Sequence, residues 1–180
     1  SDAPLTAEEL EEAGLVQWPQ IMGGVVPVVN VEGVEPGELR LSNELLADIF
    51  LGKISKWDAP EIAELNPDLD LPSSRITVVY RSDGSGTTFN FTDYLAKVSD
   101  EWKEKVGVGK AVSWPTGVSG KGNEGVASYV GRIPGGIGYV EYAYALENQL
   151  SHVSLRNREG NWVQPSSETF QAAAAGADWA

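Results

Sequence analysis

The stretch Arg81-Ser82-Asp83-Gly84-Ser85-Gly86-Thr87-Thr88 lies between two segments of different periodicity. In the residues before it, Arg75 to Tyr80, every position after the arginine is β-branched or aromatic, which predicts a buried strand. In Thr87 to Val98 the apolar side chains recur at helical spacing, which predicts a helix. The octapeptide is therefore predicted to be a strand-to-helix turn.

Hydrogen-bond donors dominate this turn. Ser85, which we expect to cap the helix, Thr87 and Thr88 carry hydroxyl groups, and Arg81 adds a planar fork of N–H groups. The first N–H groups of the helix have no partner within the helix and lie at the positive end of its dipole. With two glycines to let the backbone curl and only Asp83 as an acceptor, the turn suits a small oxyanion. The same letters also suit an ordinary surface turn in which Arg81 pairs with Asp83, and the residues alone leave both interpretations open.

Helical and strand patterns alternate along the rest of the chain, which predicts an α/β fold. Helices are predicted over residues 7–13 after a Thr6-x-x-Glu9 capping box, 43–50 after Ser42, 58–64 with an Asp58-x-x-Glu61 box, 100–105 after Ser99, 126–130, 143–148 and from Ser166 or Ser167 to 175. Strands are predicted over 25–30 with an irregular point at Pro27, 110–114, 136–142, and as a hairpin of 152–155 with 162–163. A glycine-rich loop is predicted over 117–125.

Two further features, a glycine-rich motif and the single histidine, could indicate cofactor binding or catalysis. Gly120-x-Gly122-x-x-Gly125 has the letters of a dinucleotide fingerprint, but we interpret it as a loop and helix start because Glu141 comes too early for the required acid. His152 is the only histidine and cysteine is absent, so we expect no zinc site and no Ser-His-Asp set. No cofactor and no metal are expected.

Composition narrows the class of partner. The 180 residues carry 13 Lys and Arg against 26 Asp and Glu, a formal charge of −13. This charge argues against nucleic acid and against an anionic membrane surface. No apolar run approaches the roughly 20 residues that a membrane helix needs. The chain opens on Ser1-Asp2-Ala3-Pro4 with no signal peptide, as expected of a mature chain, an excised domain or a trimmed chain.

Six segments resemble the phosphate-binding protein of the bacterial ABC-type phosphate importer. They are Ser1 to Leu5 (SDAPL), Gly23 to Asn30 (GGVVPVVN), Ile49 to Gly52 (IFLG), Arg81 to Thr87 (RSDGSGT), Gly120 to Val126 (GKGNEGV) and Ile137 to Ala143 (IGYVEYA). The resemblance implies a non-enzymatic, two-lobed receptor of the type II periplasmic-binding-protein fold, periplasmic or anchored at the cell surface, with the importer's membrane permease as a partner. It implies that inorganic phosphate is held between the lobes by hydrogen bonds alone.

The resemblance also implies roles for single residues. Asp2 matches the carboxylate that accepts the proton of hydrogenphosphate, and Arg81 matches the arginine that binds the oxyanion. Ser85, Gly86 and Thr87 match the donors at the helix start, and Asp83 matches an acid beside the arginine.

Length is where the chain departs from the family, whose members are considerably longer. We expect residues 1–21 to be a remnant of the first lobe and residues 22–180 to be largely the second lobe, with a central mixed sheet flanked by helices. A single lobe leaves the bound anion exposed to water, so weak phosphate binding is expected. Two alternatives stay open: an interaction module that self-associates through an exposed lobe face, and an enzyme acting on phosphate esters.

Overall fold

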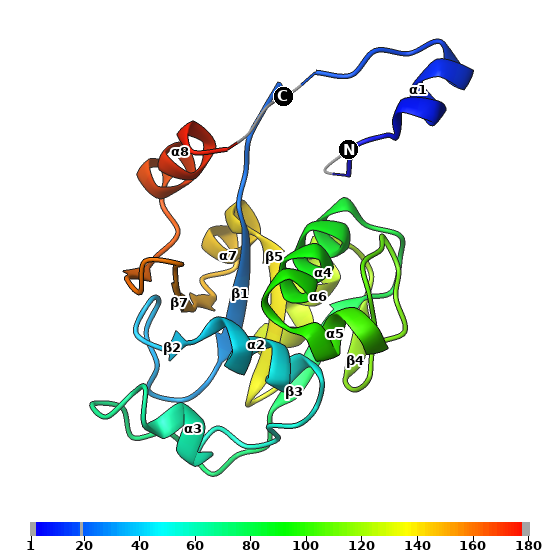
Figure 1. The fold of residues 1–180 in the computed structure, drawn as a ribbon. Coiled ribbons are helices and arrows are strands. Elements are labelled where there is room, and N and C mark those ends of the chain that lie inside the picture. The colour runs from blue at the N-terminus through cyan, green and yellow to red at the C-terminus, as the bar shows by residue number, and fades with distance from the viewer. Residues whose placement is uncertain (1–2, 19, 178–180) are drawn as a thin grey trace.

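A five-stranded mixed sheet forms the centre of the computed structural model, which describes residues 3–18 and 20–177 (Figure 1). Its strands are β1 (Val25–Asn30), β3 (Thr77–Arg81), β4 (Val118–Gly120), β5 (Gly136–Glu141) and β6 (Ser151–His152). Their order is β4-β3-β5-β1-β6, with β3 parallel to β4 and β5, and β1 antiparallel to β5 and β6. Because β1 begins opposite the last residue of β5, the carboxyl ends of the parallel strands and the start of β1 lie at one end of the sheet.

Alternate residues along the strands enter two separate hydrophobic cores, because side chains in a strand point to opposite faces in turn. Val78 belongs to one core and Val79 to the other. The first core also contains side chains of α2 (Asn43–Phe50), α4 (Gly86–Val98) and α5 (Asp100–Lys105). The second contains side chains of α6 (Gly122–Arg132) and α7 (Tyr142–Glu147). Helices therefore cover both faces, and the predicted α/β class with a mixed central sheet is confirmed.

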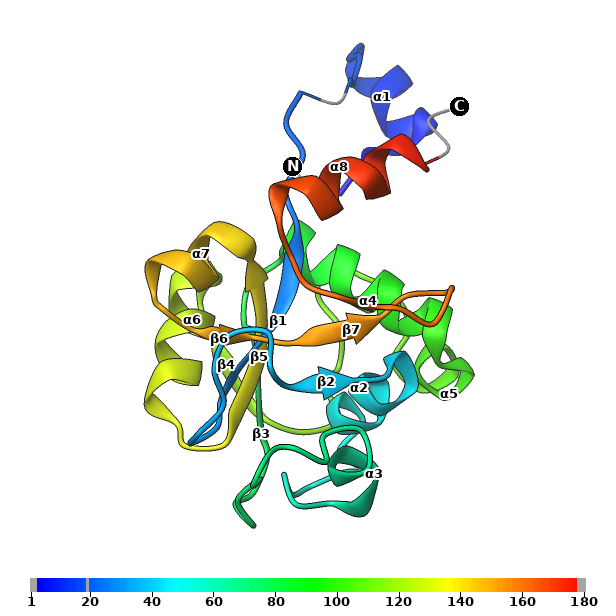
Figure 2. The same cartoon turned by 90° about the vertical axis from the view of Figure 1, so that its left-hand side faces the viewer.

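A second, three-stranded sheet lies beside the main one (Figure 2). It consists of β2 (Arg40–Leu41), β7 (Ser154–Arg156) and β8 (Trp162–Val163), in the order β2-β7-β8. The antiparallel pair of β7 and β8 confirms the predicted hairpin. The short helix α3 (Pro60–Ala63) precedes the loop that reaches this sheet.

Two helices lie beyond the end of the sheet at which β1 begins (Figures 1 and 2). They are α1 (Ala7–Ala13) and α8 (Ser167–Ala175), and neither contains a buried residue. Phe170 of α8 still makes an edge contact with Tyr142, with 5.5 Å between the ring centroids. Within the described residues, no helix is both long and apolar enough to cross a membrane.

Most predicted elements and most of the predicted helix caps are confirmed. The Thr6–Glu9 box and the caps at Ser42, Ser99 and Ser166 all form. The central strand covers Thr77–Arg81 rather than residues 75–80, and the helix after it begins at Gly86.

Four expectations are wrong. Residues 110–114 form no strand, because Trp114 packs flat on Tyr80 and Tyr139 while Val118–Gly120 pairs with β3 instead. The predicted loop 117–125 accordingly contains β4 and the first turn of α6. Asp58 does not cap α3, whose N-cap is Ala59 followed by a proline. Pro27 causes no irregularity, since the pairing of β1 with β5 is continuous through it.

Candidate anion-binding site

The octapeptide forms the predicted turn between β3 and α4. Ser85 is the N-cap of α4, and its Oγ accepts a hydrogen bond from the N–H of Thr88 at 3.1 Å. The N–H of Ser85 donates to the carbonyl of Lys110 at 2.9 Å, which fixes the cap from outside the helix. The start of a 13-residue helix, where the dipole is positive, therefore lies directly after the end of β3.

Arg81 and Asp83 form a two-point ion pair at the strand end. Nε of Arg81 donates to Oδ1 of Asp83 at 2.9 Å, and Nη2 donates to Oδ2 at 2.6 Å. The Arg81 side chain is only 10% exposed, whereas that of Asp83 is 35% exposed. The guanidinium has five N–H groups, and this geometry leaves three of them for another acceptor.

Both partners of this pair have shifted pKa values. The hydrogen bonds from Arg81, followed by the one from the N–H of Gly122, hold the pKa of Asp83 well below its usual range. The hydrogen bond to Asp83 raises the pKa of Arg81. The pair is therefore ionised at neutral pH, with a cationic group oriented beside the helix start.

The second glycine-rich stretch lies directly against this turn. The N–H of Gly122 donates to Oδ1 of Asp83 at 3.0 Å, and the N–H of Ser82 donates to the carbonyl of Gly120 at 2.9 Å. Rather than a loop, the stretch is the junction of β4 with α6. Its role here is to hold Asp83, and through it the guanidinium of Arg81.

Tyr139 is a site residue that the sequence interpretation did not identify. Its buried hydroxyl accepts a hydrogen bond from the main-chain N–H of Arg81 at 3.2 Å and lies 2.7 Å from Oγ1 of Thr88. Burial raises the pKa of Tyr139 to about 12, so it stays protonated. A tyrosine in an otherwise apolar strand is a weak signal, and its partners lie 51 and 58 positions away in the chain.

Five of the six predicted site residues share the one turn: Arg81, Asp83, Ser85, Gly86 and Thr87. Asp2, the sixth, lies outside the described residues. Ser85 and Thr87 are 5% and 2% exposed, so their hydroxyl groups are largely withdrawn from water. Gly84 and Gly86 do not occupy the left-handed region, so the turn does not need the conformational freedom expected of them.

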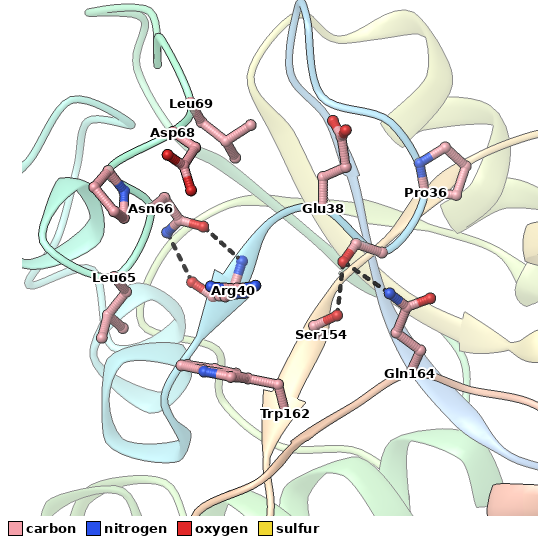
Figure 3. Close-up of a pocket in the computed structure, with 12 residues that line it drawn as sticks. Pro36, Glu38, Arg40, Leu65, Asn66, Asp68, Leu69, Ser154, Trp162 and Gln164 are labelled. Atoms are coloured by element: carbon pink, nitrogen blue, oxygen red, sulfur yellow. Dashed lines mark hydrogen bonds between the residues drawn. The ribbon is translucent and has the colours of Figure 1, made fainter.

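A separate cavity of about 500 Å³ opens beside the small sheet and is not part of this turn (Figure 3). The guanidinium of Arg40 lies 5.8 Å from the ring centre of Trp162 at its wall. The side-chain amide of Asn66 pairs with β2 there, accepting from the N–H of Arg40 at 2.8 Å and donating to its carbonyl at 2.9 Å. Gln164, a further lining residue, hydrogen-bonds to His152, whose pKa is lowered by burial. The single histidine is thus buried in β6, at the edge of the main sheet.

Comparison with known proteins places the chain among binding proteins. A family model described as "PBP superfamily domain" matches residues 1–177. The "Phosphate-binding protein PstS" of Xylella fastidiosa (strain 9a5c) is 64% identical over 179 residues, which are 99% of this chain and 49% of the relative. The protein of the same name from Pasteurella multocida (strain Pm70) is 62% identical over 99% of this chain and 52% of its own length. The chain thus spans about half the length of the curated relatives it matches.

Solved structures give the same fold at low sequence identity. A "high affinity periplasmic phosphate-binding protein (PfluDING) bound with phosphate" superposes with a TM-score of 0.75 at 24% identity, over 99% of this chain and 52% of that one. A human phosphate binding apolipoprotein gives a TM-score of 0.76 at 24% identity, over 98% of this chain and 53% of that one.

Proposed function

The chain belongs to the family described as the PBP superfamily domain, and on this premise we propose that it binds inorganic phosphate non-covalently at the Arg81–Thr88 turn. The observation that carries the proposal is the preorganised Arg81 guanidinium, which has three N–H groups beside the start of α4 that its bonds to Asp83 do not use. Charge-assisted hydrogen bonds from such a group are strong, and no reorganisation is needed when the anion arrives. Relatives more than 60% identical over nearly the whole chain are named as phosphate-binding proteins, which supports this ligand.

In this proposal Ser85, Gly86 and Thr87 supply hydroxyl or main-chain donors, and Asp83 orients the arginine. In the complete two-lobed receptor, Asp2 would accept the proton of hydrogenphosphate, a role assigned from the family resemblance. Such a carboxylate favours hydrogenphosphate, which donates its proton to the carboxylate, over sulfate, which has no proton to donate. With sulfate, an oxygen of the carboxylate and an oxygen of the anion would face each other as buried acceptors without a hydrogen bond.

The proposed setting is uptake by an ABC-type phosphate importer, with the chain's parent protein in the periplasm or anchored at the cell surface and the importer's permease as its partner. We assign residues 22–180 to one lobe and residues 1–21 to another. Both α1 and α8 lie beyond the end of the sheet, but α8 contacts Tyr142 through Phe170 and α1 contains no buried residue, which supports this division. No chemical turnover is part of the proposal, and phosphate esters should stay intact at high protein concentration.

The test is titration with phosphate and with sulfate, followed by calorimetry or by amide chemical shifts. One lobe leaves the anion exposed to water, so we expect a dissociation constant of about 1 mM or looser, near −4 kcal/mol. For the same reason the chain should discriminate poorly between the two anions, and Asp2→Asn should change their affinity ratio little. Sub-micromolar binding by the monomer would contradict the single-lobe assignment, and no binding at tens of millimolar would contradict the function.

Self-association is a second candidate, favoured by an exposed apolar segment between α1 and β1. Val16 is 79% exposed, Trp18 66% and Ile21 92%. Large apolar side chains gathered in one exposed segment are typical of interaction surfaces. Light scattering over a range of protein concentrations, with and without phosphate, tests it; a monomer at all concentrations contradicts it.

A further inference from the structure

The hydroxyl of Tyr139 joins the two segments that carry the donors of the candidate site. It accepts from the main-chain N–H of Arg81, at the end of β3, and it bonds to Oγ1 of Thr88, in the first turn of α4. A third strand, β5, therefore holds the strand end and the helix start in a fixed relation.

The ring of Tyr139 leaves its hydroxyl little freedom to move. It stacks on Phe91 at 4.4 Å with an interplanar angle of 11°, and on Trp114 at 5.6 Å with an angle of 22°. The residue is fully buried, and aromatic side chains in such close-packed surroundings keep one rotamer. The hydroxyl oxygen of Tyr139 is consequently held in a fixed position.

The phenolic oxygen of Tyr139 takes part in two hydrogen bonds. It accepts from the main-chain N–H of Arg81. In its bond to Thr88 either hydroxyl group can be the donor. In both directions the bonds connect the Arg81 N–H, Tyr139 and Thr88 in one continuous chain.

We propose that Tyr139 is a positioning residue for Arg81, fixing the end of β3 against the start of α4 so that guanidinium and helix donors converge on one anion. The role in affinity rests on the proposed binding of phosphate, whereas the role in holding Arg81 does not. Tyr139→Phe removes one oxygen atom and leaves both the N–H of Arg81 and the hydroxyl of Thr88 without that partner.

The experiment compares Tyr139→Phe with Tyr94→Phe. Tyr94 also loses one hydroxyl bond, 2.7 Å to Oδ1 of Asn43, but this bond ties α4 to α2 away from the turn. Phosphate titration at a temperature where each variant is folded should show binding weakened about three- to tenfold in Tyr139→Phe, and within twofold of the wild type in Tyr94→Phe. Equal affinities in the two variants would overturn the affinity role.

A ligand-free measurement separates this inference from the proposed function. The Nε–H of Arg81, assigned by its loss in Arg81→Lys, should exchange with solvent about tenfold faster in Tyr139→Phe than in Tyr94→Phe. An unchanged exchange rate would overturn the positioning role even if phosphate binds. If the wild type does not bind phosphate, the proposed function fails and the exchange rate still decides the role of Tyr139.

Should Tyr139→Phe fail to fold, Thr88 offers a smaller change. Thr88→Val removes the hydroxyl group that bonds to Tyr139, and Thr88→Ser keeps it. We expect faster Arg81 Nε–H exchange in Thr88→Val and wild-type exchange in Thr88→Ser; the same rate in both variants contradicts the proposal.

Discussion

The turn of residues 81–88 and the turn of residues 120–125 lie side by side, and each leads from a strand into a helix. Both are rich in glycine. In the first, the helix is capped by the side chain of Ser85, whereas the N-cap of α6 is Lys121, which makes no side-chain capping bond. Only the first turn therefore combines a hydroxyl cap with an ion-paired arginine.

The glycines of the two turns differ in the space around them and in their backbone conformation. A Cβ atom at Gly84 would meet nothing within 4 Å. At Gly120 it would lie 2.6 Å from the carbonyl carbon of Gly125, and Gly122 has a φ of +72°. Glycine in the second turn permits close backbone packing and a left-handed residue, whereas Gly84 stands in open space.

This difference assigns separate tasks to the two turns. The second turn is a packed support that holds Asp83 through the N–H of Gly122, and the first turn presents donors. Each of the following variants should affect one of these tasks more than the other.

Arg81→Ala should give the largest effect on binding. It removes the oriented guanidinium and leaves Asp83 without its main partner, so phosphate affinity should fall by about 2 kcal/mol or more. Lys121→Ala is the matched control, because it removes the same charge from the neighbouring turn. Calorimetric titration of both variants checks this; equal losses would mean that net charge rather than geometry determines binding.

Gly120→Ala should destabilise the fold by about 2 kcal/mol, because the new methyl group would clash with the backbone of Gly125. Relieving this clash would require β4 or α6 to move out of its packed position. Gly84→Ala, in open space, should change the free energy of unfolding by less than about 0.5 kcal/mol. Urea unfolding of the two variants measures the contrast. A larger cost at Gly84 would reverse the assignment of tasks.

The helix caps of the two turns can be tested by removing the cap that exists and by adding the one that is missing. Ser85→Ala should cost about 1 kcal/mol of stability, since the N–H of Thr88 loses its acceptor. Lys121→Ser should add about 0.5 kcal/mol by giving α6 the cap it lacks. Thermal unfolding without phosphate is the measurement, and a loss of stability in Lys121→Ser would contradict the second expectation.

The pH dependence of the Arg81–Asp83 pair should be the smallest effect. The pKa of Asp83 is lowered on folding, so its contribution is present above the ordinary carboxyl value of 3.8 and is lost as the pH falls toward the lowered value. Asp83 is about one-third exposed, so solvent screening should keep the contribution below about 1 kcal/mol. The gap in unfolding free energy between wild type and Asp83→Asn should therefore narrow from pH 6 to pH 3; a constant gap would contradict it.

Local signals in the sequence predicted the parts of the fold that depend on neighbours in the chain. The caps at Ser42, Ser85 and Ser166 formed because a cap needs only residues three positions apart. The Arg81–Asp83 pair, which the sequence suggested as part of an ordinary surface turn, also forms between residues close in the chain, although Arg81 is only 10% exposed.

Features that depend on distant contacts were missed. Residues 110–114 have the composition of a strand, but Val118–Gly120 pairs with β3 instead, and Trp114 stacks on Tyr139 of the sheet. The same holds for Tyr139, whose hydroxyl partners are set by the pairing of β3 with β5. The pattern of β-branched and aromatic residues indicates which segments can form strands, and packing in the folded core determines which of these segments pair.

Asn66 has a consequence for how copies of this chain could meet. Its amide occupies both the N–H and the carbonyl of Arg40, as a neighbouring strand would, and a third bond to the carbonyl of Ile62 at 2.8 Å holds it in place. Exposed sheet edges invite intermolecular strand addition, and side chains that cap them protect against aggregation. An incoming chain could extend the small sheet from β2 only after Asn66 had released both groups, so β-sheet growth between molecules is blocked at this position by a single amide.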